Sequence, residues 1–166
     1  MEKAGFKVSR WAEEILNKIT FEKQKVNLVA KTVSELGFPN GGTLKEIYAK
    51  AKEQGLGLCP ASVGPNLRLA YKDQPPNEYI VVAMEPVTVS DRHPGLLGLY
   101  RSDDGEWLDA WKGCSGDQWD REDVFVFLAP KVSNPLDSLK SDVLRSFELR
   151  ISALERDIKK IKNLLN

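Results

Sequence analysis

Residues 97–111 have the sequence Leu-Gly-Leu-Tyr-Arg-Ser-Asp-Asp-Gly-Glu-Trp-Leu-Asp-Ala-Trp, and this stretch decides the fold class. Asp103, Asp104 and Gly105 at its centre are typical of a tight turn between two antiparallel strands. The apolar residues before the turn and the segment 106–111 after it have the composition of strands. The stretch therefore predicts a β-hairpin.

Further strands are expected on both sides of the hairpin. Their apolar and β-branched residues lie at 26–33, 66–72, 79–84 and 124–128. The first of these segments also fits helical spacing, and the strand interpretation is favoured. Because the segments from 66 onward are joined by short turns, we expect an antiparallel β-meander.

Two helices are predicted before the meander. Ser9 can cap a helix over 9–19. Thr43 and Glu46 have the spacing of a capping box at the start of a second helix, which Gly55 ends. We expect both helices to pack on one face of the sheet, which gives an α+β head domain over residues 1–132.

A second region, residues 133–166, is predicted to be a coiled-coil oligomerisation helix. Asn134 and Pro135 suit its N-cap and first position. Apolar residues then follow in alternating steps of three and four over about three heptads. These residues are Leu144, Phe147, Ile151, Leu154, Ile158, Ile161 and Leu165.

The charges beside the heptads favour a parallel homotrimer. Residues 150–155 resemble the R-h-x-x-h-E motif of short trimeric coiled coils, with Arg150 and Glu155 as its charged ends. Isoleucine at neighbouring core positions also disfavours a dimer. A parallel dimer is the second interpretation, and a helix folded back on its own domain is the third.

Composition narrows the class of protein further. Lysine plus arginine and aspartate plus glutamate number 24 each, which makes nucleic-acid binding a weak hypothesis. Two distant cysteines and one histidine predict no metal, cofactor or disulfide site. The chain has no signal-peptide pattern and no apolar stretch of about 20 residues, so no membrane contact and a cytoplasmic location are expected.

One polar cluster is a candidate ligand-binding site. Arg68, Tyr71, Asp73 and Gln74 lie close together in the sequence, and Glu85 can join them from a neighbouring strand. They follow a proline-rich corner that contains Cys59. The cluster either lines a pocket or satisfies the backbone of this corner, and the second interpretation is favoured.

Three tryptophans form a second candidate. Trp107 and Trp111 have the same parity in the predicted strand and should point to the same face, and Trp119 follows soon after. If they are exposed, they form a stacking or carbohydrate-binding surface, and if they are buried, they belong to the core.

Much of the region 5–128 resembles a family of uncharacterised bacterial proteins. The segment Leu-Cys-Pro-Ala-Ser-Val-Gly-Pro-Asn-Leu-Arg-Leu, residues 58–69, is the most distinctive match. The other matching segments are 5–16, 35–38, 73–75, 83–86 and 103–108. The family has no established activity, so the resemblance implies no catalytic or binding residue. The coiled-coil region from residue 134 lies outside it.

These observations favour a non-enzymatic binding or assembly module, such as a structural protein of a phage or mobile element. A protein or small molecule is the expected partner of the head. The alternative is a small hydrolytic enzyme with its site at Arg68, Tyr71, Asp73 and Glu85. Nucleic-acid binding is the third hypothesis, through lysines that are otherwise ordinary on a solvated surface. These are Lys45, Lys50, Lys52 and Lys72.

Overall fold

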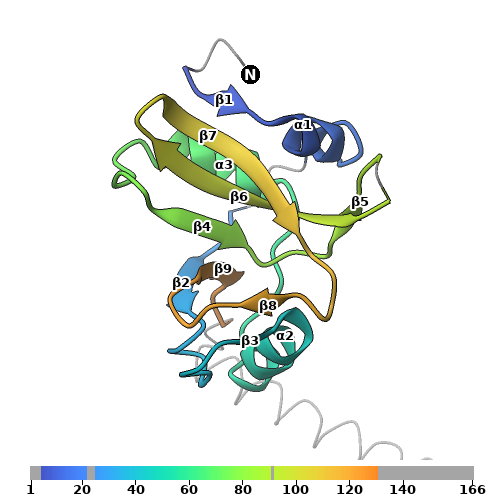
Figure 1. Cartoon of the computed structure of the whole chain (residues 1–166), viewed down its shortest axis with the longest axis vertical. Coiled ribbons are helices and arrows are strands. Elements are labelled where there is room, and N and C mark those ends of the chain that lie inside the picture. Colours follow the sequence, from blue (N-terminus) through green and yellow to red (C-terminus); the bar gives the residue numbers. More distant parts are fainter. Residues whose placement is uncertain (1–4, 22–24, 91, 131–166) are drawn as a thin grey trace, which may run out of the picture. The chain divides into compact units, whose positions relative to one another are not determined.

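The predicted hairpin is the longest strand pair in the part of the chain that the structure describes (Figure 1). A computed structural model describes residues 5–21, 25–90 and 92–130. In it, β6 (Pro94–Ser102) and β7 (Gly105–Lys112) pair antiparallel, from Gly95 opposite Lys112 to Ser102 opposite Gly105. The two aspartates between them form the turn, as predicted.

The other elements match most of the expected segments. They are β1 (Lys7–Val8), α1 (Arg10–Leu16), β2 (Leu28–Thr32), β3 (Gly42–Thr43), α2 (Leu44–Glu53), α3 (Val63–Ala70), β4 (Tyr79–Val82), β5 (Val87–Thr88), β8 (Gln118–Trp119) and β9 (Val124–Leu128). Both predicted helix starts are confirmed. The Ser9 hydroxyl accepts from the Ala12 amide at 3.3 Å, and Thr43 and Glu46 form the reciprocal capping box. The chain then leaves α2 through Gly55, whose φ of +76° suits glycine.

The α+β class is confirmed, but the antiparallel meander is wrong. The main sheet has the order β1-β7-β6-β4-β9-β2, with β5 paired to β6. Two of its pairs are parallel, β1 with β7 and β4 with β9. After β4 the chain runs through β5, β6, β7 and β8 before β9 returns beside β4, so these two parallel neighbours are far apart in sequence. A separate two-stranded sheet joins β3 and β8.

The helices do not share one face of the sheet, in contrast to the prediction. A Cβ atom at Gly95 would lie 3.0 Å from Ile15 of α1, and one at Gly64 of α3 would lie 2.9 Å from Leu97. Residues 95 and 97 point to the same side of β6, so α1 and α3 cover that side. Phe125 points to the opposite side, where its ring meets Tyr48 of α2 edge-on with centroids 6.5 Å apart.

The strand predicted at 66–72 is wrong, because this segment lies in α3. Pro65 sits in the first turn of the helix, where its fixed φ and missing N–H are tolerated. The buried residues Val63, Gly64 and Arg68 follow helical spacing toward the sheet, whereas Leu69 remains 47% exposed. The alternation of leucines that indicated a strand arises from two sides of one short helix.

The predicted domain boundary at 132/133 and the coiled coil lie outside the described residues, and the homotrimer therefore stays a prediction. Within the described ranges, no helix is long and apolar enough to cross a membrane.

Candidate functional site

The Arg68 side chain is fully buried and is held on three sides. Its guanidinium donates to the Gln74 side chain and to the Tyr71 carbonyl, and Nη2 lies 3.2 Å from a Glu106 carboxylate oxygen. Loss of solvation lowers the pKa of Arg68, and the nearby Glu106 charge opposes that shift. The arginine therefore links the end of α3 to the hairpin.

Gln74 extends the same network toward the sheet. It is completely buried, and its amide nitrogen donates to the carbonyls of Glu78 at 3.0 Å and Leu99 at 3.4 Å. Arg101 Nη1 donates to the Gln74 carbonyl at 2.6 Å. These contacts satisfy the backbone of the proline-containing turn before β4, whereas the favoured sequence interpretation assigned this role to the corner that contains Cys59.

The remaining members of the predicted polar cluster are more open. Tyr71 is half-buried, and Asp73 and Glu85 are exposed. Among the described residues, no hydrogen bond or ion pair joins Glu85 to the Arg68 network. The structure thus brings together Arg68, Gln74 and the Tyr71 backbone, with Glu106 as an acidic partner that the sequence interpretation did not include.

Cys59 is buried beside the sheet. Its amide donates to the Ala83 carbonyl at 2.7 Å, and its sulfur lies 3.5 Å from the Val126 carbonyl oxygen. Burial raises the pKa of the thiol to about 12. At neutral pH this cysteine is a protonated, inaccessible packing residue rather than a nucleophile.

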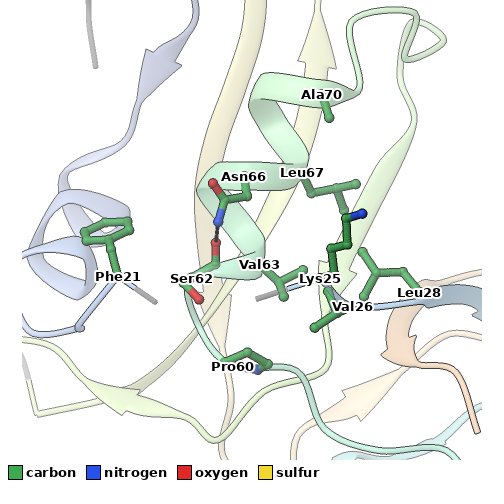
Figure 2. Close-up of a pocket in the computed structure, with 10 residues that line it drawn as sticks. All are labelled: Phe21, Lys25, Val26, Leu28, Pro60, Ser62, Val63, Asn66, Leu67 and Ala70. Atoms are coloured by element: carbon green, nitrogen blue, oxygen red, sulfur yellow. Dashed lines mark hydrogen bonds between the residues drawn. The ribbon is translucent and has the colours of Figure 1, made fainter. Parts of the chain in front are cut away.

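A cleft of about 630 Å³ lies between α3 and the chain before β2 (Figure 2). Its walls are mostly apolar, and the Asn66 amide turns back to donate to the Ser62 carbonyl at 2.9 Å. Phe21 stands apart at one side with 55% of its surface exposed. The cleft is lined by Phe21, Lys25, Val26, Leu28, Pro60, Ser62, Val63, Asn66, Leu67 and Ala70.

The face of the sheet that α1 and α3 do not cover carries a row of aromatic side chains across β4, β6 and β7. Tyr79 of β4 pairs with Tyr100 of β6, which pairs with Trp107 of β7, and we call these three residues the aromatic row. The two tyrosine rings stack with centroids 4.4 Å apart and an interplanar angle of 13°. Trp111 adds a perpendicular ring, 6.3 Å from Tyr79 at 81°.

The Trp107 end of the row is fixed by charged neighbours. Trp107 Nε1 donates to Asp104 at 3.0 Å, and the Lys7 ammonium lies 5.0 Å from the centre of the Trp107 ring. Lys7 also forms a 2.9 Å ion pair with Asp104. The Asp104 carboxylate is occupied by structural contacts and is not arranged as a metal ligand.

A second cleft, which we call the Tyr79 cleft, lies beside the aromatic row and has a volume of about 480 Å³. Asp117 and Asp123 each accept a backbone hydrogen bond of 2.7 Å through one oxygen, from Cys114 and Asp120 respectively. Burial raises the pKa of Asp123. The lining comprises Tyr79, Val81, Trp111, Lys112, Asp117, Gln118, Trp119, Asp123 and Val124.

Only some of the residues of the aromatic row and the Tyr79 cleft were predicted from the sequence. Trp107 and Trp111 lie on one face of β7, as their parity predicted, and both are half-buried. Trp119 is buried at 9% exposure and lines the Tyr79 cleft from β8. The contributions of Tyr79 and Asp123 were missed, because they depend on β4 lying beside β6 and β9. Across the described ranges, no group of three potential metal ligands is present.

No family model matches this chain, and searches of curated proteins and of solved structures find no similar protein. The family resemblance seen in the sequence therefore stays a prediction.

Proposed function

We propose that this protein is a non-enzymatic binding and assembly module. Its head recognises a partner through the aromatic row and the Tyr79 cleft, and its C-terminal coiled coil joins three copies. The observation that carries the proposal is the position of Tyr79, which is 46% exposed although its ring stacks on Tyr100. Clustered, partly exposed aromatic side chains are typical of recognition surfaces, because they offer a large apolar area together with polar atoms.

The contacts of the Arg68 network support a binding module over the hydrolytic alternative. Catalysis at Arg68 would need a guanidinium that can reach a substrate, whereas this side chain is buried and bonded to Gln74, Tyr71 and Glu106. If the Arg68 guanidinium moved toward a substrate, the Gln74 side-chain oxygen and the Tyr71 carbonyl would lose their hydrogen-bond donor. Its arrangement is that of a structural arginine.

Assembly raises the overall binding affinity of a weak recognition surface. When three heads are linked, each further binding event becomes intramolecular, so avidity can exceed the single-site affinity by a factor on the order of 10². The support for assembly is the heptad pattern from Leu144 to Leu165 in the sequence.

Light scattering on the full chain tests the assembly. We expect three times the protomer mass of 18.6 kDa. A full-chain variant with Ile151→Asn and Leu154→Asn should be monomeric, because both changes place an amide in the apolar seam. The matched control is Ser152→Asn, which lies between them outside the seam and should stay trimeric. A monomeric wild-type chain, or a double variant that keeps the wild-type mass, would refute the assembly.

A further inference from the structure

We infer that the Tyr79 cleft binds a sugar ring of a neutral carbohydrate. The inference rests on the proposed function, because it takes the aromatic face as the recognition surface, and it adds the class of ligand. The volume of about 480 Å³ falls within the range of about 300–1,000 Å³ that is usual for small-ligand sites.

The aromatic walls suit the apolar faces of a sugar. Tyr79 and Trp111 stand at 81° to each other with centroids 6.3 Å apart, so they form a corner with two walls of different orientation. Tyr79 is braced by its stacking on Tyr100, and Trp111 is packed over Gly98. Both rings are thus held in place before a ligand arrives, which lowers the entropic cost of binding.

The polar groups of the cleft suit hydroxyl groups. A sugar hydroxyl both donates and accepts, so a site for it needs acceptors and donors together. Asp117 and Asp123 supply acceptors, Lys112 supplies a donor, and Gln118 supplies both. Each carboxylate is fixed by one backbone hydrogen bond and retains further lone pairs for a ligand.

The charges of the lining disfavour an anion, because Asp117 and Asp123 place two carboxylates in the cleft against the single ammonium of Lys112. A neutral polyol meets no such repulsion and can bond to both kinds of group. A small organic cation is the alternative ligand, and the test below includes one. The cleft beside α3 has mostly apolar walls and lacks this combination of carboxylate, amide and ammonium groups.

The test is a calorimetric titration of the full chain with cellohexaose, xylohexaose, hexa-N-acetylchitohexaose and maltohexaose, each up to about 10 mM. We expect at least one of these saccharides to bind. Tyr79→Ala and Gln118→Ala change partly or fully exposed residues and should each weaken binding, Tyr79→Ala by about tenfold or more. Phe21→Ala removes an exposed ring from the other cleft and should leave the affinity unchanged.

Three outcomes would overturn the inference. They are no binding of any of the four saccharides, binding that both cleft variants leave unchanged, and binding of tetramethylammonium chloride in place of the saccharides. Circular dichroism of each variant confirms that it is folded.

The affinity per protomer is independent of assembly, so the two proposals fail separately. A trimer that binds no saccharide refutes the ligand class alone. A monomer that binds one refutes the assembly alone. The double variant with Ile151→Asn and Leu154→Asn should keep the wild-type affinity for a soluble hexasaccharide, because only one cleft is involved in each binding event.

Discussion

The Trp111 ring packs against Gly98, on the strand next to its own. A Cβ atom at residue 98 would collide with the Trp111 ring and would lie 2.6 Å from the Ile80 carbonyl oxygen. Glycine is required here by close approach rather than by an unusual φ, since residue 98 is not among the positions with positive φ. This contact sets the orientation of one wall of the Tyr79 cleft.

Gly98→Ala should therefore destabilise the protein by about 1–3 kcal/mol, as expected when a methyl group is forced into a packed site. Urea unfolding followed by circular dichroism measures the change. Gly116→Ala is the matched control, because a Cβ atom there would meet nothing within 4 Å. The control should change the free energy of unfolding by less than about 0.5 kcal/mol. Equal stability of wild type and Gly98→Ala would contradict the contact.

Glu106→Gln should destabilise the head because it leaves the buried Arg68 charge without its carboxylate partner. Breaking a fully buried pair costs about 3–5 kcal/mol, but Glu106 is partly exposed and Arg68 keeps two other acceptors, so we expect about 1–2 kcal/mol. Chemical denaturation at neutral pH measures the loss.

The control for this variant is Glu122→Gln. Glu122 lies 3.7 Å from Arg121 with both side chains largely exposed, so the pair contributes little to stability. Glu122→Gln should therefore cause no measurable change in the free energy of unfolding. If both glutamate variants lost the same free energy of unfolding, the Arg68–Glu106 pair would have no special structural role.

The local elements could largely be predicted from the sequence, whereas their order in the sheet could not. The hairpin was found because its turn residues and flanking strands are adjacent in the chain. The parallel pairing of β4 with β9 joins segments that are separated by four other strands, and no local pattern encodes it. For α3, the spacing of Val63, Leu67 and Ala70, with Pro65 in the first turn, was the helical signal that the alternating leucines concealed.

Part of the candidate site could likewise be predicted from local sequence, and part of it could not. Period-two alternation placed Trp107 and Trp111 on one face, because both lie in a single regular strand. Tyr79 joins them only through the register of β4 with β6, and Asp123 only through the position of β9. The site is thus built from long-range pairing, which a single sequence does not reveal.

Asp104 should make the stability of the head sensitive to acid. Its carboxylate accepts from the Ser102 hydroxyl, Trp107 Nε1 and the Lys7 ammonium, and these hydrogen bonds, that from Ser102 foremost, hold its pKa well below the ordinary value. In the unfolded chain an aspartate takes up a proton near pH 4. The stabilisation is therefore present at neutral pH and is lost as the pH falls below about 4.

Urea midpoints at about pH 6 and about pH 3 test this dependence. The wild type should lose more stability between the two values than Asp104→Asn, which cannot ionise at this position. Asp103→Asn changes the exposed neighbour in the same turn, which makes none of the three hydrogen bonds, and should behave like the wild type. An Asp104→Asn variant with the full wild-type acid sensitivity would contradict the assignment.

Cys59 should report on opening of the core through its reaction with a thiol reagent. In a full-chain Cys114→Ser variant Cys59 is the remaining thiol, and burial and its raised pKa of about 12 both suppress the reactive thiolate. We expect very slow labelling by dithionitrobenzoate at about pH 8 and rapid labelling in denaturant. Because labelling then requires opening, the rate should rise when Gly98→Ala is added and should stay unchanged with Gly116→Ala. Fast labelling of the native chain, at a rate that Gly98→Ala does not change, would show that Cys59 is accessible without unfolding.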